Sequence, residues 1–379
     1  MMRALDEARE VCEAYLPGLL SKLSGTPFLE LERPGNPGLE MFKAAGGPGV
    51  LIPTGYSGSG ASPSEAIRIT RAIAAASPSL AVASTMHHFS VATIFTLADS
   101  LQSSGVEWAL LEGIATNNLL VSSGFAEGNP GQGILSPTVG AVRGDGGIVV
   151  NGSKRPCSMS RSMDLLSASV SVPREGGGSE VVMMLVPAQT EGISVHPFWA
   201  SNVLAGAESD EVRLTDVFVD DRLLVPTETG DNGELDELQT VGFMWFEMLI
   251  TSCYLGMVSA LVERAFTNKK LGRDRVAALG VRLETATLLM EGIATRLAAG
   301  EKSNAALTNT MIARYGAQDA IVDAAGMAAE ALGGMGFISS PDVAYLVAAA
   351  QCVKFHPPSR ASTERGLAGT FSGDVLRID

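Results

Sequence analysis

The order of helical and strand-forming segments is the feature that most constrains how this chain can fold. Residues 1–118 are rich in Ala, carry apolar residues at helical spacing and are interrupted by Gly/Pro stretches. Residues 119–228 change to short runs typical of strands, and residues 229–379 return to helical spacing. Few folds place a small β domain between two all-α segments. The sequence therefore predicts an α+β protein with three domains bounded at these positions.

Local signals support this division. Either Ser62 or Ser64 is placed to cap a helix that begins near Pro63. Gly-Asp-Gly-Gly at 144–147 separates two extended runs and predicts a β-hairpin. The helix predicted over 311–334 should end at its final Gly-Gly pair, where a C-cap is expected.

Charge and composition narrow the possible partners and compartments. The net charge of −14 disfavours binding to nucleic acid or to an anionic membrane surface. The longest apolar run, 248–262, is too short to span a bilayer and is expected to form a buried helix. Four cysteines lie far apart without a CxxC pair, so we expect no metal site, no disulfide framework and a cytoplasmic location.

Four stretches carry a resemblance to a known family. They are GVLIPTGYSGSG at 49–60, AEGNPGQG at 126–133 ahead of VVNGSKRPCSMS at 149–160, DEVRLTDVFVDDRLLVP at 210–226, and EALGGMGFISSPDVAYLVAAA at 330–350. In this order and spacing the chain resembles the acyl-CoA dehydrogenase superfamily over nearly its whole length. The resemblance implies an N-terminal helical domain, a small central β-barrel or β-sandwich, and a C-terminal four-helix bundle. It also implies a homodimer or homotetramer.

The resemblance further implies an FAD site. The glycines of 126–133 let backbone N–H groups approach an anion or a ring edge, although a simple turn would have the same composition. The family's arginine segment is shortened at 268–279, which suggests that flavin is held weakly or differently, for example as diffusible FADH₂ supplied by a flavin reductase. The implied flavin contacts are Phe125, Ala126, Gly131, Gln132, Pro156, Ser158, Glu330, Gly333 and Gly334.

The chain departs from the dehydrogenase pattern at the catalytic base. Most family members carry a glutamate where this sequence has FHPP at 355–358. A minority carry it on the first long helix of the bundle, where Phe246 takes the expected position and Glu247 follows it. One residue rotates a helical side chain by about 100°, so Glu247 is either a base that still reaches the site or a salt-bridged helix residue.

The histidines resemble those of oxygen-using members of the superfamily, such as dibenzothiophene monooxygenase and the nitrososynthases. That group has a histidine late in the N-terminal domain, a serine in the strand loop and a histidine near the C-terminus, matched here by His87 or His88, Ser158 and His356. An imidazole with a pKa near neutrality could hold or donate a proton during oxygen chemistry. The predicted catalytic residues are therefore His356, His88, Ser158 and Glu247, although a helical histidine is as often a core residue.

Three functions follow from the sequence. The first is a flavin-dependent oxidoreductase, leaning toward a monooxygenase that acts on a small or carrier-tethered metabolite. The second is an FAD-dependent dehydrogenase of an acyl thioester on CoA or an acyl carrier protein, with Glu247 or His356 as base. The third is a flavin-free relative with a binding or non-redox role.

Overall fold

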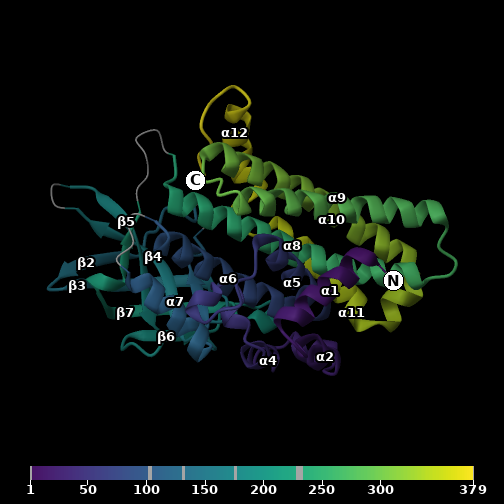
Figure 1. The fold of residues 1–379 in the computed structure, drawn as a ribbon, viewed down its shortest axis with the longest axis horizontal. Coiled ribbons are helices and arrows are strands. Elements are labelled where there is room, and N and C mark those ends of the chain that lie inside the picture. The colour runs from purple at the N-terminus through teal and green to yellow at the C-terminus, as the bar shows by residue number, and fades with distance from the viewer. Residues whose placement is uncertain (1, 101–104, 130–132, 175–176, 228–233, 379) are drawn as a thin grey trace.

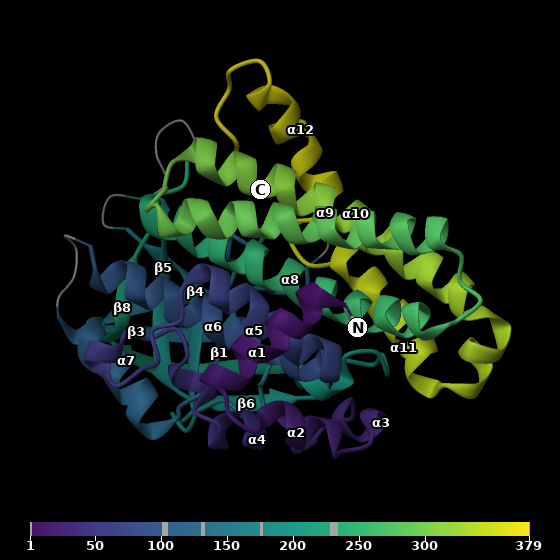
Figure 2. The same ribbon diagram turned by 45° about the vertical axis from the view of Figure 1, so that its right-hand side comes forward.

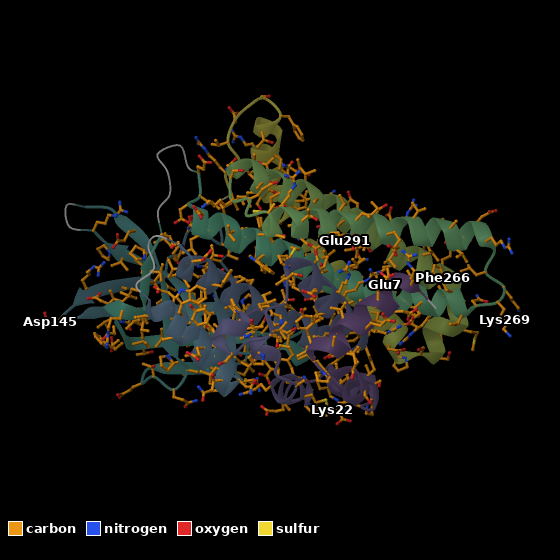
Figure 3. The ribbon with its side chains drawn as sticks, in the orientation of Figure 1. Glu7, Lys22, Asp145, Phe266, Lys269 and Glu291 are labelled. Atoms are coloured by element: carbon orange, nitrogen blue, oxygen red, sulfur yellow. The ribbon has the colours of Figure 1, made fainter. Side chains whose placement is uncertain are left out.

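The computed structural model describes residues 2–100, 105–129, 133–174, 177–227 and 234–378 of the chain. Figures 1 and 2 show the N-terminal helices packed along the C-terminal helices, with the strands gathered at one end of the molecule. In Figure 3, Asp145 marks the tip of a hairpin at the strand end, and Lys269 marks the opposite end. The helix, strand, helix order predicted from the sequence is confirmed.

The helices and strands have the following bounds. The N-terminal helices are α1 (Arg3–Tyr15), α2 (Leu19–Ser24), α3 (Phe28–Leu31), α4 (Gly38–Ala44), α5 (Pro63–Ala76), α6 (Pro78–Ala98) and α7 (Val106–Asn117). The strands are β1 (Val121–Gly124), β2 (Gly140–Gly144), β3 (Gly147–Cys157), β4 (Leu165–Pro173), β5 (Ser179–Pro187), β6 (Ile193–His196), β7 (Asp210–Asp220) and β8 (Leu224–Pro226). The C-terminal helices are α8 (Glu237–Thr267), α9 (Arg273–Ala298), α10 (Asn304–Ser339), α11 (Pro341–Gln351) and α12 (Arg360–Thr370).

Helices from both ends of the chain share one apolar core. Helix α5 begins at a capping box in which Ser62 and Glu65 bond each other's backbone, so Ser62 is the cap. Helix α8 packs closely on α5 at Gly256, where a Cβ atom would lie 2.3 Å from the carbonyl oxygen of Arg71. A larger residue at Gly256 would push the two helices apart.

The central strands form one eight-stranded sheet with its own apolar core. Strands β2 and β3 pair as the predicted hairpin, with Gly144 opposite Gly147 and Gly146 at a φ of 72° in the turn. The strand order is β6-β7-β3-β2-β4-β5-β8, and β1 pairs with β4 in parallel. This pairing attaches the chain that leaves the N-terminal helices directly to the sheet.

Helix α10 contains the helix end that the sequence predicts at Gly333-Gly334. Its bounds join two helical segments across Gly333, which has a non-helical φ of 71° and ψ of 174°. Glycine adopts this backbone without steric cost, so the first segment ends there and a short second segment continues to Ser339.

Three helices in the described part of the chain, α6, α8 and α10, are long and apolar enough to cross a membrane by length and composition. The most apolar windows of α8 and α6 are 89% and 72% buried inside the protein. The apolar run of α8 is therefore the buried helix that the sequence predicts. The corresponding window of α10 is only 22% buried, which leaves an apolar helix face exposed.

Candidate active site

A cavity of about 130 Å³ lies where the N-terminal helices, the sheet and the C-terminal helices meet. Three aromatic rings join the three parts around it: Phe89 of α6 lies 6.1 Å from Phe125 after β1 and 5.1 Å from Phe246 of α8, measured between ring centroids. Most of the lining is apolar. The polar residues of the lining are Thr93, Ser123, Ser158, Ser169, Thr227, Gln239 and His356.

This lining fits the flavin that the fold family implies. Two polar atoms of lining residues, Ser169 Oγ on the sheet side and Gln239 Oε1 on the helix side, are buried without a hydrogen-bond partner in the described structure. A flavin ring carries carbonyl acceptors and an N–H donor, and its faces suit contact with aromatic side chains.

Four of the predicted cofactor residues come together in this lining: Phe125, Ala126, Pro156 and Ser158. Ser158 is 8% exposed, and its Oγ lies 3.0 Å from Ser209 Oγ. Its backbone carbonyl accepts a hydrogen bond of 2.6 Å from Ser122 Oγ. These bonds anchor Ser158 to β1 and to the start of β7 while its side chain borders the cavity.

Two of the remaining predicted cofactor residues, Gly131 and Gln132, lie outside the described residues. The other three, Glu330, Gly333 and Gly334, are absent from the cavity lining. Glu330 pairs on the surface with Arg275, 2.9 Å away. Glu330, Gly333 and Gly334 belong to the end of α10 that leads into α11, far from the strands (Figures 1 and 2). These three residues are thus separated from the cavity lining, and their contact with FAD stays a prediction.

His356 borders the cavity from the turn after α11, as the sequence predicts. Its Nδ1 lies 2.7 Å from the hydroxyl of Tyr254 on α8. The pKa of His356 is lowered to about 4, mainly by burial and also by the charge of Arg314, while a Cys352 backbone hydrogen bond opposes the change. The imidazole is therefore neutral at pH 7 and does not have the near-neutral pKa that we expected.

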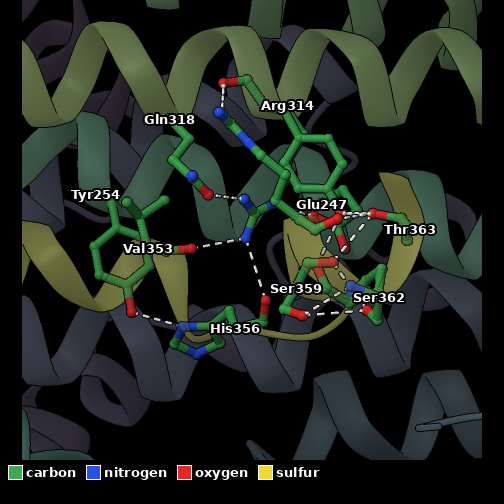
Figure 4. A network of polar contacts seen from close by, with 12 residues as sticks. Glu247, Tyr254, Arg314, Gln318, Val353, His356, Ser359, Ser362 and Thr363 are labelled. Carbon is green, nitrogen blue, oxygen red and sulfur yellow. Dashed lines mark hydrogen bonds and ion pairs between the residues drawn. The ribbon is translucent and has the colours of Figure 1, made fainter. Parts of the chain in front are cut away.

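Arg314 of α10 holds the backbone of the His356 turn (Figure 4). Its Nη2 donates hydrogen bonds to the carbonyls of Val353, at 2.7 Å, and His356, at 3.2 Å. Its Nε lies 3.0 Å from Glu247 Oε2, and both charged side chains are completely buried. The ion pair thus supplies the negative charge that a buried guanidinium requires.

Glu247 is therefore placed as a partner of Arg314 and not at the cavity. Phe246 lines the cavity, and Glu247, one residue later, is rotated away by about 100°. Burial raises the pKa of Glu247 to about 7, and Arg314 opposes the rise. The position of this carboxylate corrects the prediction that it serves as a catalytic base.

The same helical geometry removes His88 from the cavity. Met86, Phe89 and Thr93 of α6 face the cavity at spacings of three and four residues, and His88 points elsewhere. Both of its ring nitrogens are buried without a hydrogen-bond partner in the described structure. As a catalytic residue His88 would have to face the cavity, so the structure corrects this prediction as well.

His87 has a structural role. Its Nδ1 accepts a hydrogen bond of 3.0 Å from the Val121 amide, and its Nε2 lies 3.0 Å from the Pro48 carbonyl oxygen. These bonds tie β1 to α6, and through α6 they fix the position of the cavity wall.

Sequence reasoning missed several residues that support the site. Tyr254 lies inside the apolar run of α8, where the sequence pattern indicates only a buried core residue. Arg314 lies in α10, and no local motif marks it as part of a site. Lys154 and Glu127 form a buried ion pair of 2.7 Å, and Glu127 also accepts hydrogen bonds from the amides of Thr138 and Val139. Glu127 lies within the glycine-rich segment 126–133, and this charged residue was the one feature of the sequence that could have indicated that the loop after β1 is anchored by an ion pair.

Comparison with known proteins identifies the family. No protein-family model matches the chain. It is 46% identical over 378 residues to isobutylamine N-hydroxylase from Streptomyces viridifaciens, and the match covers 100% of both chains.

Solved structures show the same fold at low sequence identity. A nitrososynthase from Micromonospora carbonacea var. africana superposes with a TM-score of 0.83 at 18% identity, covering 97% of each chain. FMN-bound TdsC from Paenibacillus sp. A11-2 gives 0.78 at 18% identity, covering 99% of this chain and 98% of that chain. Butyryl-CoA dehydrogenase from Megasphaera elsdenii gives 0.82 at 14% identity, covering 98% and 99%. These structures confirm the predicted acyl-CoA dehydrogenase fold.

These findings decide among the three functions considered. The described lining contains no carboxylate that could serve an acyl-thioester dehydrogenase as base, and the full-length relative is a hydroxylase. The cavity fits a flavin, so a flavin-free role is not retained. The chain belongs to the flavin-dependent monooxygenases with the acyl-CoA dehydrogenase fold, and it acts on a small molecule.

Proposed function

We propose that this enzyme hydroxylates the nitrogen of a small aliphatic primary amine. The observation that carries the proposal is the 46% identity over the full length to an isobutylamine N-hydroxylase. The reaction would convert R–NH₂, O₂ and reduced flavin to R–NHOH, water and oxidised flavin. When bound, reduced flavin would supply the two electrons that activate oxygen.

The cavity suits a neutral amine. Its described lining includes no Asp, Glu, Lys or Arg side chain. Moving an ammonium ion into such a site is costly, whereas a short alkyl amine gains from contact with the apolar wall. The free base is also the form whose nitrogen lone pair can accept an oxygen atom, so binding and chemistry favour the same protonation state.

Ser158 and His356 would act from opposite sides of this cavity. The Ser158 hydroxyl would bond the flavin or the substrate from the sheet side, and the neutral imidazole of His356 would orient a polar group from the helix side. Phe89, Phe125 and Phe246 would exclude water and so protect the oxidising equivalents from loss.

We propose that the cofactor is FAD, taken up as FADH₂ from a separate flavin reductase in the cytoplasm. The shortened segment at 268–279 and the distance of Glu330 from the cavity support weak flavin binding. FMN is present in the TdsC structure, so anaerobic titrations with FADH₂ and FMNH₂ should be compared. Tighter binding of FMNH₂ would contradict the choice of FAD.

We also propose a homodimer or homotetramer that uses the exposed apolar faces of α9 and α10. Val281 and Leu288 of α9 are 63% and 66% exposed, and Ile312 of α10 is 42% exposed. Residues of this type on one surface usually mark an interface. Sedimentation of wild type and Leu288→Glu tests this: an oligomer that dissociates in the variant supports it, and a monomeric wild type contradicts it.

Product analysis tests the proposed reaction. The enzyme would be supplied with a flavin reductase, NADH, FAD, ¹⁸O₂ and isobutylamine, and the products would be identified by mass spectrometry. We expect an N-alkylhydroxylamine that carries one ¹⁸O atom and is absent when either enzyme is omitted. Anaerobic bleaching of bound FAD by butyryl-CoA, without any amine oxidation, would contradict the proposal.

A further inference from the structure

We propose that Tyr254 is a positioning residue that fixes His356 in one tautomer, with Nδ1 unprotonated and Nε2–H directed at the cavity. The tautomer depends on the contacts of the His356 ring, and only the expected change in turnover rests on the proposed amine hydroxylation. Tyr254 does not line the cavity. It acts through His356, which does.

The contact between the two residues is well defined. Tyr254 is completely buried in α8, and its hydroxyl oxygen lies 2.7 Å from His356 Nδ1 (Figure 4). Their ring planes meet at 59°, so the rings are not stacked and the hydrogen bond is the specific contact. Within the described chain, Nδ1 is the hydrogen-bond partner of this hydroxyl.

The tautomer follows from donor and acceptor counting. A buried phenol O–H must donate a hydrogen bond or lose the hydration it has in water. If Nδ1 carried a proton, two donors would face each other unless the phenol proton turned to an empty position. With Nδ1 unprotonated the phenol donates to it, and the neutral ring then carries its proton on Nε2.

The surroundings favour a neutral imidazole. Burial and the Arg314 guanidinium both lower the pKa of His356, while burial raises the pKa of Tyr254 well above its ordinary value, so the phenol keeps its proton. A Cys352 backbone hydrogen bond opposes part of the lowering at His356. Donation from Tyr254 to Nδ1 leaves the imidazole proton on Nε2, whereas donation from the ring to Tyr254 would place it on Nδ1.

Two separate hydrogen bonds then fix the position and orientation of His356. Arg314 holds its backbone carbonyl, and Tyr254 holds its ring. The result is an N–H donor, not an acceptor, facing the cavity. Such a donor can bond an oxygen atom of a bound reactant, and it cannot remove a proton from an amine until it has released its own.

Nitrogen NMR of the imidazoles tests the tautomer directly. The chain has four histidines, so protein labelled with ¹⁵N-histidine gives few signals, and His356→Gln identifies those of His356 by their loss. We expect the wild-type signals of an Nε2–H ring and, in Tyr254→Phe, a shift toward the Nδ1–H form or a mixture. Tyr345→Phe, which removes a hydroxyl bonded to Glu32 away from the cavity, should leave the His356 signals unchanged.

Turnover provides a second readout. In Tyr254→Phe we expect kcat for amine hydroxylation to fall about tenfold with little change in KM, and hydrogen peroxide release per NADH to rise, because binding is kept while orientation is lost. Wild-type signals of an Nδ1–H ring would overturn the proposal, and so would a Tyr254→Phe protein with unchanged signals and turnover. If isobutylamine is not a substrate, the NMR result still decides the tautomer. If Tyr254→Phe does not fold, the wild-type spectrum alone decides it.

Discussion

Glu247 and Arg314 face each other at 3.0 Å, with neither side chain exposed to solvent. The pair lies directly behind the cavity wall, because Phe246 precedes Glu247 and Arg314 bonds the carbonyl of His356. The carboxylate of Glu247, which the sequence offered as a candidate base, thus helps to hold the turn that carries His356 at the cavity.

Removing one charged side chain of this pair should lower the free energy of unfolding more than the replacement of both by apolar residues would suggest. Glu247→Leu leaves Arg314 charged and unpaired in the core, and we expect the free energy of unfolding to fall by about 3–5 kcal/mol. The double variant Glu247→Leu/Arg314→Met should lose less than the sum of the two single changes. Urea denaturation at fixed protein concentration measures all four proteins. Strictly additive losses would show that the two side chains are not coupled.

Ser158→Ala should weaken flavin binding without unfolding the protein. The Ser158 hydroxyl borders the cavity and would make one neutral hydrogen bond to the flavin. Losing that bond would cost about 1 kcal/mol, or roughly fivefold in Kd for reduced or oxidised flavin. Fluorescence titration of FAD measures the change. The matched control is Ser160→Ala, which removes a hydroxyl bonded to the Glu208 carbonyl outside the cavity lining. Equal effects of both variants on flavin affinity would remove Ser158 from the site.

Phe246→Ala should change which amines the enzyme accepts. The ring forms part of the apolar wall between Phe89 and His356, and its removal makes room for a longer alkyl chain. We expect kcat/KM for hexylamine relative to isobutylamine to rise by roughly tenfold, since a few methylenes in an apolar pocket are worth 1–3 kcal/mol. Phe371→Ala, a change at a side chain that is 78% exposed, should leave the ratio unchanged. An unaltered ratio in Phe246→Ala would mean that the substrate lies elsewhere.

His87 should make the protein less stable in acid. Burial lowers its pKa to about 4 in the folded state, whereas the unfolded value is about 6.5. Below pH 6.5 the His87 side chain binds a proton in the unfolded chain but stays neutral in the folded protein. Its contribution to the free energy of unfolding is therefore complete above pH 6.5 and is lost as the pH falls toward 4. The full loss corresponds to about 3 kcal/mol.

His87→Gln isolates this effect, because glutamine keeps a donor and an acceptor for the Pro48 carbonyl and the Val121 amide but does not titrate. The difference in free energy of unfolding between wild type and variant should shift in favour of the variant from pH 7 to pH 4.5. A difference that stays constant over this range would show that His87 is not held neutral.

Local sequence patterns were sufficient for much of the architecture. The hairpin at 144–147 and the cap of α5 depend on residues a few positions apart, so local turn and capping chemistry predicted both, and the structure selected Ser62 from the two candidate serines. Phe125, Pro156, Ser158 and His356 were placed at the site from the family resemblance, and all four line the cavity. The length of the apolar run at 248–262 likewise identified the buried part of α8.

Helix rotation and long-range pairing were decided by the tertiary structure. In α6 and α8 nearly every position is apolar or small, so the sequence does not say which face meets the cavity; packing turns Phe89 and Phe246 inward and His88 and Glu247 away. Tyr254 and His356 are 102 residues apart in the chain, and no local pattern predicts their contact. The sequence by itself determined the order of the elements and the types of residue available for catalysis. Only the packing of the helices against one another and against the sheet decided which of those residues face the cavity, because one residue of helical rotation separates the cavity wall from the core.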